Sequence, residues 1–295
     1  MDDELDSNDG TLVGRVIRVA DLQLRLVSVL GSGAYGTVYL AFDRITAQAY
    51  AVKHLPEAHL TSAQRRLQRI EATLHARCNG HPGVLQLHHI VPRYPGVDGW
   101  FMVLDYCSEG DLFEYINDGR LGQRTLEREA RRLLEEIISA VEWCHRRGVY
   151  HRDIKPENVL MRRGADGRMH ACLGDFGLAT EDAWSTEHGC GSTFYMSPES
   201  RSSAAPAPYA TQPSDVWSVA VLLVNMTCAR NPWRRAERHD ATFASFLRDP
   251  IGTLTVALPI TEGFARVLAR CFDPNPVRRC TLEELRQIMR ACPRL

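Results

Sequence analysis

HRDIKPEN, residues 151–158, places Asp153, Lys155 and Asn158 within six consecutive positions. Pro156 argues against an amphipathic helix, because a proline in a helix interior costs about 3 kcal/mol. The run of charged and amide side chains argues against a strand. We therefore predict a loop in which closely spaced polar groups carry out chemistry.

The composition is that of an ordinary globular protein, with 295 residues, 44% hydrophobic content and a net charge of −1. No global field favours nucleic acid or an anionic membrane as a partner. The longest apolar run, residues 216–226, is shorter than the roughly 20 residues of a membrane span and is predicted to be a buried helix. The nine cysteines lack CxxC spacing, and the acidic N-terminus lacks a secretion-signal pattern. We therefore expect reduced cysteines and a cytoplasmic and/or nuclear protein.

The first third of the chain has strand-like patterning. Residues 1–20 are predicted to be an acidic N-terminal tail, and residues 22–43 alternate apolar and polar positions on both sides of a glycine-rich turn, which predicts a hairpin. Further strands are predicted at 49–55 and 99–107, with a helix at 62–78 between them. The helical spacing rests on three apolar residues, Leu67, Ile70 and Leu74.

Helices dominate the remainder. Residues 125–148 form a long helical pattern that ends at Gly148, as helices often do. Residues 199–214, rich in Ser, Ala and Pro, are predicted to be a loop. A strand-rich first third followed by a helix-rich remainder predicts an α+β protein with two lobes.

Two features of the first lobe suggest a phosphate site. GSGAYGTV, residues 31–38, fits G-x-G-x-x-G-x-V, a pattern that alone also suits a plain glycine-rich hairpin. Strands on both sides favour a flap over nucleotide phosphates rather than a dinucleotide-binding turn, which needs a helix. Lys53 lies in the apolar strand that follows and needs a partner, for which we choose Glu71 of the next helix.

The loop at 151–158 then fits phosphoryl transfer, which requires an aligned acceptor hydroxyl, neutralised charge and a held metal. Asp153 can accept the hydroxyl proton, and Lys155 can contact the γ-phosphate. Asn158 can ligate magnesium, with Asp175 of GDFGLA as the second ligand. A fourth signature is MSPES, in which we expect Glu199 to pair with Arg279.

Taken together, these motifs resemble the eukaryotic protein kinase family over residues 22–293. Lys155 together with Ser192 resembles its serine/threonine class. The resemblance implies a bilobal α+β kinase fold: a small antiparallel β-sheet N-lobe with one main helix at 21–104, a hinge at 105–110, and a larger helical C-lobe at 111–295. It also implies transfer of the γ-phosphoryl group of ATP, with Mg²⁺, to serine or threonine hydroxyls of protein substrates.

The family's residue roles carry over by position. Asp153, Lys155, Lys53 and Glu71 would be the catalytic set, Asn158 and Asp175 the metal ligands, and Asp215 the brace beneath the catalytic loop. Val38, Ala51 and Leu160 would sandwich the adenine, with Leu104 as gatekeeper and the backbone of Asp105 and Cys107 at the adenine edge. The full nucleotide-binding set would be Leu30, Gly31, Ser32, Gly33, Gly36, Val38, Ala51, Lys53, Leu104, Asp105, Cys107, Asp111 and Leu160.

A closer resemblance links the chain to fungal serine/threonine kinases concerned with inhibition of meiosis and with nutrient response. It rests on GSTFYMSPE and above all on CARNPWRRAERHDATFASFL, residues 228–247, which we interpret as a mark of lineage outside the active site. The departures from the kinase pattern are mild: Ile154, Ser197 and Ala220 replace common residues, and none removes a group that the chemistry needs.

Regulation and specificity leave alternatives open. By resemblance, Arg152 would pair with a phosphate on Ser185 or Thr186 of the activation loop, residues 175–199, added by an upstream kinase. Alternatively, a carboxylate already present supplies the negative charge, or the loop orders without help. The carboxylates available are Glu181, Asp182 and Glu187. Asp111 and Glu157 match positions that contact basic residues upstream of the acceptor, or they are solvated surface charges.

Rival functions are weaker. A pseudokinase scaffold would keep the fold without chemistry, but the complete catalytic set argues for an enzyme. A small-molecule kinase would not need the segment that includes MSPE, residues 196–199. We interpret His81, His88 and His89 as loop and strand-edge residues rather than a metal cluster, and the basic runs RRLQR and RRAER as solvated helix faces.

Overall fold

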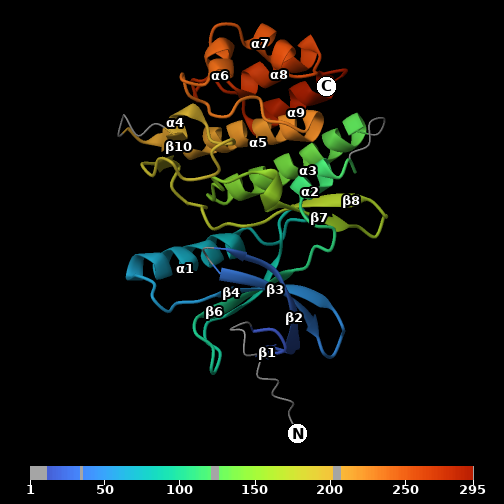
Figure 1. The fold of residues 1–295 in the computed structure, drawn as a ribbon, viewed down its shortest axis with the longest axis vertical. Coiled ribbons are helices and arrows are strands. Elements are labelled where there is room, and N and C mark those ends of the chain that lie inside the picture. Colours follow the sequence, from blue (N-terminus) through green and yellow to red (C-terminus); the bar gives the residue numbers. More distant parts are fainter. Residues whose placement is uncertain (1–11, 34–35, 121–125, 202–206, 295) are drawn as a thin grey trace. The chain divides into compact units, whose positions relative to one another are not determined.

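The computed structural model describes residues 12–33, 36–120, 126–201 and 207–294. The chain divides into two compact units (Figure 1). The first comprises residues 1–80 and 85–108, and the second comprises residues 81–84 and 109–295.

The first unit is an antiparallel sheet with one helix. Its strands are β1 (Val16–Val19), β2 (Leu22–Gly33), β3 (Gly36–Asp43), β4 (Ala49–Leu55), β5 (Leu87–Val91) and β6 (Trp100–Asp105). They lie in the order β1-β2-β3-β4-β6-β5, and every neighbouring pair is antiparallel. Alternate apolar side chains of these strands meet on one face and form a core that includes Ile17, Leu24, Tyr39, Val52, Phe101 and Val103.

The helix of this unit is α1 (Ser62–Arg77). It begins with a capping box, in which the Thr61 hydroxyl accepts from the backbone N–H of Gln64 while the Gln64 side chain accepts from that of Thr61. Leu74 and Glu71 lie on its buried face, whereas Leu67 is 56% exposed. The predicted helix is confirmed, but the assignment of Leu67 to its apolar stripe is wrong. The side chains that α1 buries are Gln68, Glu71, Ala72, Leu74 and His75, all of which follow Leu67 in the chain.

The structure differs from the sequence prediction at the N-terminus. Residues 1–20 were predicted to be a tail, yet β1 lies within that range and pairs with β2 from Val16↔Arg25 to Val19↔Leu22. Ile17 of β1 is fully buried in the core, so ordered structure begins before residue 21. Residues 1–11, the acidic part of that stretch, lie outside the described residues.

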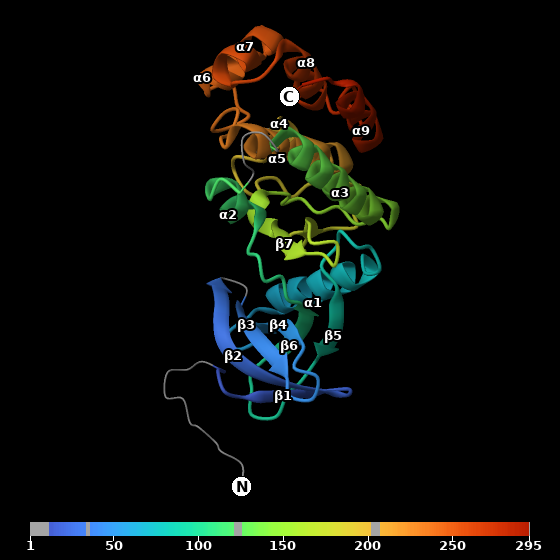
Figure 2. The ribbon, with the colours of Figure 1, turned by 90° about the vertical axis from the view of Figure 1, so that its right-hand side faces the viewer.

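Helices make up most of the second unit: α2 (Leu112–Asn117), α3 (Leu126–Arg146), α4 (Pro198–Arg201), α5 (Thr211–Cys228), α6 (Ala241–Phe246), α7 (Pro250–Ala257), α8 (Glu262–Cys271) and α9 (Leu282–Ala291). The α3 helix packs against α5 and α9, and α8 packs against α5, α7 and α9 (Figure 2). After α3, Gly148 adopts a positive φ of 66° as predicted for a helix-terminating glycine.

The α5 helix is the buried helix expected at residues 216–226. It is apolar on all sides, and its interior residues are almost completely buried. It begins at Thr211, so the last turn of the predicted 199–214 loop is helical, and α4 occupies its start. The remainder of the described loop contributes β10 (Tyr209–Ala210).

Four short strands follow α3 in this unit and form two antiparallel pairs. The β7 strand (Val159–Arg163) pairs antiparallel with β8 (Met169–Leu173), and β9 (Trp184–Ser185) pairs with β10. A single 3-10 turn, η1 (Pro156–Asn158), leads into β7. The basic run RRAER, residues 234–238, lies in an irregular loop between α5 and α6, so its prediction as a helix face is wrong.

Among the described residues, no single helix has the length and apolarity needed to cross a membrane. The pair α7 and α8 would pass on length and composition alone, with a bend of 118° at their junction.

Candidate active site

The glycine-rich turn joins β2 and β3 of the first unit. Its strands pair up to Gly33↔Gly36, and residues 34 and 35 at the tip lie outside the described residues. Gly36 has a φ of 136°, and an added Cβ would lie 2.0 Å from the backbone oxygen of His54. Only glycine fits there. Leu30, Gly31, Ser32 and Gly33 are exposed, so the backbone of the turn is open to a ligand.

Lys53 and Glu71 form an ion pair within the same unit. The Lys53 Nζ donates to Glu71 Oε1, and the two side chains are 14% and 5% exposed. In the β3–β4 register Lys53 lies opposite Val38, close in sequence to the turn, and Ala51 is buried two residues earlier. The structure thus contains the predicted pair, while the role of Lys53 on nucleotide phosphates stays a prediction.

The end of β6 carries the residues predicted to meet the adenine edge. Leu104 is buried, and Asp105 donates its backbone N–H to the oxygen of Gln86 at 3.0 Å. A backbone contact from Asp105 to an adenine would therefore use its carbonyl oxygen. The Asp105 carboxylate lies 2.7 Å from His88 Nε2. Cys107, two residues later, is half-buried.

In the second unit, Asp215 of α5 fixes the start of the loop at residues 151–158, which is the predicted catalytic loop. This carboxylate is completely buried and accepts from the backbone N–H groups of His151 at 2.9 Å and Arg152 at 2.8 Å. His145 Nε2, at the end of α3, lies 2.8 Å away. Burial opposes ionisation, but the contact with His145 and the other donors outweighs it and lowers the pKa of Asp215.

The brace explains the unusual backbone at Arg152, whose φ is 65°. A left-handed conformation at a non-glycine residue persists only where its surroundings hold it. Two backbone hydrogen bonds to one buried carboxylate provide that restraint. The next residue, Asp153, is thereby fixed in direction.

Asp153 is held by donors on both of its carboxylate oxygens. Ser192 donates its backbone N–H to Oδ1 at 2.8 Å, and Lys155 Nζ and Asn158 Nδ2 lie 2.8 and 3.1 Å from Oδ2. Burial would raise the pKa of Asp153, but the hydrogen bond and charge of Lys155, with the bond from Ser192, lower it below its usual value. Asp153 is therefore a carboxylate that is ionised and oriented at neutral pH.

Lys155 links this carboxylate to the segment at residues 191–197. Its Nζ also donates to the Ser192 hydroxyl at 2.8 Å. The sequence prediction brought Lys155 and Ser192 together only through resemblance. The structure places both within hydrogen-bond distance of the Asp153 side chain.

Asn158 and Asp175 offer oxygen donors for a divalent cation. The Asn158 amide nitrogen bonds the backbone and side chain of Asp153, which leaves its Oδ1 as the atom of ligand type. The Gly174 N–H donates to the Asn158 backbone oxygen at 2.9 Å, and Asp175 follows with a φ of 53° and an exposed side chain. Two protein oxygens suit Mg²⁺, which keeps waters and phosphates as its other ligands.

This donor set is limited to two residues. Within the described part of the chain no group of three His, Cys, Asp or Glu could hold a metal ion, His81, His88 and His89 included. Asn158 and Asp175 therefore fit a cation shared with a phosphate ligand rather than a metal bound by protein alone.

Two further residues of the predicted nucleotide set lie in the second unit. Asp111 caps α2, its Oδ1 accepting from the backbone N–H of Glu114 at 2.8 Å. Leu160 of β7 forms an isolated bridge with Asp111 and is half-buried. The expected sandwich of an adenine by Val38, Ala51 and Leu160 stays a prediction.

The pair Glu199 and Arg279 is present as predicted. Arg279 Nη1 and Nη2 lie 2.6 and 2.9 Å from the two carboxylate oxygens of Glu199. The Arg279 side chain is completely buried and also donates to the backbone oxygens of Pro213 and Asp273. This pair ties α4 to the loop between α8 and α9.

The activation segment, residues 175–199, has a contact that the sequence left open. Arg152 Nη1 lies 2.8 Å from Glu187 Oε2 and 3.2 Å from the Ser185 hydroxyl. Ser185 is buried where β9 pairs with β10, whereas Thr186 is exposed. Of the three carboxylates considered from the sequence, the structure brings Glu187 to Arg152.

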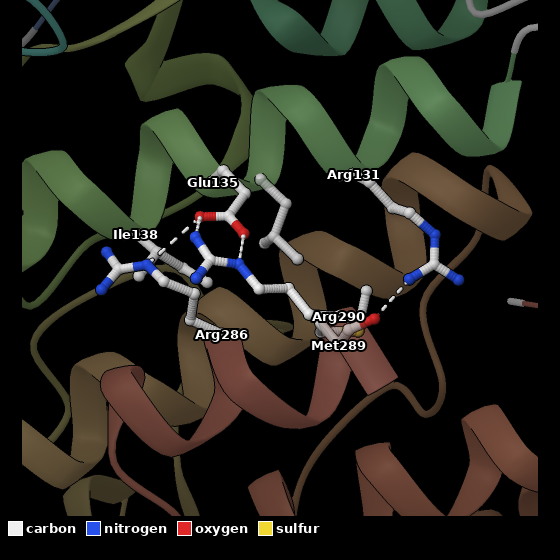
Figure 3. Close-up of a pocket in the computed structure, with 7 residues that line it drawn as sticks. Arg131, Glu135, Ile138, Arg286, Met289 and Arg290 are labelled. Atoms are coloured by element: carbon white, nitrogen blue, oxygen red, sulfur yellow. Dashed lines mark hydrogen bonds and ion pairs between the residues drawn. The ribbon is translucent and has the colours of Figure 1, made fainter. Parts of the chain in front are cut away.

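A separate hollow of about 50 Å³ lies between α3 and α9. Figure 3 shows Glu135 of α3 between the side chains of Arg286 and Arg290, and Arg131 reaching the backbone oxygen of Met289. The hollow has none of the predicted catalytic residues in its lining. Glu135 pairs with Arg286 and Arg290, and Arg131 pairs with Glu127 outside the lining. This arrangement supports helix packing rather than a reaction.

His145 and the pair Arg201 and Glu237 were missed from the sequence. His145 had no local signal for its contact, because its partner Asp215 lies 70 residues further along the chain. Arg201 and Glu237 had none, since 36 residues separate them.

The comparisons with known proteins agree with this geometry. The family described as the protein kinase domain matches residues 24–289. The negative regulator of sexual conjugation and meiosis of Schizosaccharomyces pombe is 39% identical over 98% of this chain, which spans 63% of that protein.

Two relatives from Saccharomyces cerevisiae are also similar. The serine/threonine-protein kinase VHS1 is 29% identical over 88% of this chain and 68% of its own length. The carbon catabolite-derepressing protein kinase is 33% identical over 89% of this chain but only 39% of its own length.

Proposed function

Because the chain belongs to the protein kinase domain family and its relatives include serine/threonine kinases, we propose that it transfers the γ-phosphoryl group of ATP to serine or threonine hydroxyls of protein substrates. The observation that carries the proposal is the set of donors around Asp153: Lys155, Asn158 and the Ser192 backbone orient an ionised carboxylate, and Asn158 also carries one of the two oxygen donors suited to magnesium.

The chemistry assigns one task to each group. An acceptor hydroxyl attacks the γ-phosphorus, the bond to the β–γ bridging oxygen breaks, and ADP leaves. Asp153 orients the hydroxyl and takes its proton. Lys155 stabilises negative charge on the transferred group. Magnesium, held by Asn158 and Asp175 when bound, would neutralise phosphate charge.

The first unit would bind the nucleotide. Its glycine-rich turn exposes backbone around Gly31 and Gly33, and Lys53 is a cation fixed by Glu71. A lysine oriented by a buried carboxylate can bind phosphate oxygens without losing much side-chain freedom on binding. These two features support a site for the phosphates of ATP in the first unit.

We also infer a preference for basic residues upstream of the acceptor. Glu157 is exposed beside the catalytic loop, so its carboxylate can pair with an arginine of a substrate peptide. Asp111 is the weaker member of the predicted pair because one of its oxygens already caps α2. A peptide array should show lower transfer when an upstream arginine is replaced by alanine, and an unchanged profile would refute the preference.

The activation segment is proposed to order without an upstream kinase. Glu187 supplies the carboxylate that Arg152 would otherwise receive from a phosphate, and Ser185 is buried. Thr186 remains the accessible acceptor for an activating kinase. Mass spectrometry of active protein should find Ser185 and Thr186 unmodified, and activity that depends on a phosphate at Thr186 would contradict this reading.

The test of the function separates the enzyme from a scaffold. Wild-type protein is incubated with γ-labelled Mg-ATP and a basic protein substrate, beside Asp175→Asn. We expect labelled phosphoserine or phosphothreonine with the wild type and strongly reduced label with the variant. Nucleotide binding without transfer by the wild type, before and after treatment with an upstream kinase, would favour a pseudokinase.

A further inference from the structure

The loop between α5 and α6, residues 229–240, is rigidly anchored at its base. Trp233 is buried in an aromatic cluster, with ring centroids 4.8 Å from Phe272, 5.0 Å from Phe243 and 5.5 Å from Trp217. Such ring pairs add to the stabilisation from burial alone. From the sequence alone, we interpret this loop only as a mark of lineage. The packing of Trp233 shows that the loop also has a defined position in the second unit.

Asp240 fixes the other side of the loop. Its Oδ2 accepts from the backbone N–H groups of Arg234 and Arg235 at 3.0 and 3.2 Å, and its Oδ1 caps α6. Glu237 lies between these anchored points, and its own N–H donates to the oxygen of Arg235. The backbone that carries the Glu237 side chain is therefore restrained from both directions.

Glu237 binds Arg201, the last residue of α4. Arg201 Nε and Nη2 both donate to Glu237 Oε1, at 2.8 and 2.5 Å. The Arg201 side chain is 12% exposed and that of Glu237 is 34% exposed. The hydrogen bond from Arg201 is the main reason that the pKa of Glu237 lies below its usual value. The pair is ionised and partly shielded from water.

The third nitrogen of the Arg201 guanidinium, Nη1, contacts residues 193–196, which directly follow Ser192. Arg201 Nη1 donates to the backbone oxygen of Thr193 at 3.2 Å and lies 3.7 Å from the Met196 sulfur. Thr193 directly follows Ser192, whose backbone and hydroxyl bond Asp153 and Lys155. The segment is thus held at one end by the catalytic loop and at the other by Arg201.

The first half of this segment faces solvent, whereas Tyr195 and Met196 are buried. Thr193 is exposed, and Phe194 is 45% exposed although it is a large apolar side chain. An exposed aromatic on a segment fixed at both ends is suited to contact an extended peptide. The α5 helix holds Tyr195, since the Ser218 hydroxyl donates to its backbone oxygen at 2.9 Å. Arg201 adds contacts at Thr193 and Met196, and the bonds to Glu237 fix the direction of Arg201.

We propose that Arg201 and Glu237 are positioning residues for the protein substrate: they hold residues 193–196 so that an acceptor peptide can dock beside Asp153. The inference rests on the proposed kinase function. The loop at residues 229–240 thereby takes part in recognition of the acceptor peptide without contacting the reacting atoms.

The experiment compares Glu237→Gln with Arg238→Gln, a neighbouring exposed residue of the same loop. For each variant, the KM for an acceptor peptide, the KM for ATP and the rate of ATP hydrolysis with water as acceptor are measured. We expect Glu237→Gln to raise the peptide KM about tenfold, as for the loss of one charge-assisted hydrogen bond. The KM for ATP and the hydrolysis rate should stay within about twofold of the wild type, because neither involves the peptide.

A second variant guards against a merely structural effect. The exchange Arg201→Glu with Glu237→Arg keeps the ion pair but moves the cation away from the Thr193 oxygen. It should restore the melting temperature relative to the single substitutions without restoring the peptide KM. Hydrogen exchange at residues 193–196 should rise in Glu237→Gln and stay unchanged in Arg238→Gln.

The outcomes are distinct. If the wild type transfers phosphate and Glu237→Gln matches Arg238→Gln in peptide KM, the positioning role is refuted while the kinase function stands. If peptide KM, ATP KM and hydrolysis rate all change together, the pair is structural only and the proposal is refuted. If the wild type transfers no phosphate to any acceptor, the proposed function fails and this inference fails with it.

Discussion

The substitution Glu199→Gln should destabilise the second unit strongly. It removes the carboxylate charge opposite the completely buried side chain of Arg279, with which Glu199 makes contacts of 2.6 and 2.9 Å. Removing one partner of a buried ion pair costs about 3–5 kcal/mol, because the other charge is left without compensation. Arg279 keeps its bonds to the backbone oxygens of Pro213 and Asp273, so we expect the lower end, about 3 kcal/mol.

This free energy corresponds to a measurable shift. For a unit of about 150–250 residues, 1 kcal/mol lowers the melting temperature by roughly 2–4 °C, so Glu199→Gln should lower it by about 6–12 °C. The matched control is Glu262→Gln, which breaks an exposed pair with Arg266 whose side chains are 63% and 67% exposed. An exposed pair one helical turn apart is worth about 0.3–0.5 kcal/mol, so the control should shift the temperature by only about 1–2 °C.

The assay is thermal unfolding followed by circular dichroism, with the two variants and the wild type measured in the same buffer. Added salt should change the effect of Glu199→Gln little, since buried charges are poorly screened. Equal shifts for Glu199→Gln and Glu262→Gln would refute the reasoning, because burial would then have no influence on the value of the pair.

Further predictions concern the active site. The substitution Lys53→Met leaves the Glu71 carboxylate buried without its cation and removes a cation from the proposed phosphate site. Nucleotide affinity, measured by equilibrium binding, and the rate of labelled-phosphate transfer should therefore both fall. An unchanged nucleotide affinity would show that Lys53 does not bind the phosphates. Burial opposes ionisation of Asp153, but its contacts with Lys155 and Ser192 lower its pKa, so the transfer rate between pH 5 and 7 should show no acidic limb from this group. An acidic limb in that range that is absent from the residual rate of Asp153→Asn would contradict the assignment. Glu187→Ala should release Arg152 and raise proteolysis of the activation segment, and equal cleavage of variant and wild type would show that another contact orders it.

The catalytic loop could be predicted from sequence because its chemistry and its backbone signals lie within eight residues. Pro156 excluded a helix, and the polar side chains excluded a strand. Two other elements could also be predicted from patterns within a short stretch of sequence. Alternating apolar and polar residues predict the β2–β3 hairpin, and a continuous apolar run predicts α5. The pair Lys53 and Glu71 followed from a physical need, since a charge in an apolar strand requires a partner.

Other features depend on tertiary contacts that leave no local pattern. The β1 strand is defined by pairing with β2 and by the burial of Ile17, whereas its own four residues are too short for a period to show. The loop at residues 229–240 looked helical and basic, but Trp233 is fixed by an aromatic cluster assembled from distant helices. Arg201 and Glu237 meet only because that loop is anchored, so no spacing rule would have paired them.

The proposed mechanism depends on Asp153, which orients the acceptor and takes its proton. The most direct measurement is the rate of phosphate transfer at saturating Mg-ATP for the wild type and for Asp153→Asn, with nucleotide affinity measured on the same samples. Loss of a general base costs about 10²–10⁴-fold in rate. Asp153 contacts Asn158, a proposed metal ligand, and does not belong to the residues predicted to bind the nucleotide. The account predicts a fall of that size with nucleotide affinity unchanged. Equal transfer rates for the two proteins would contradict it.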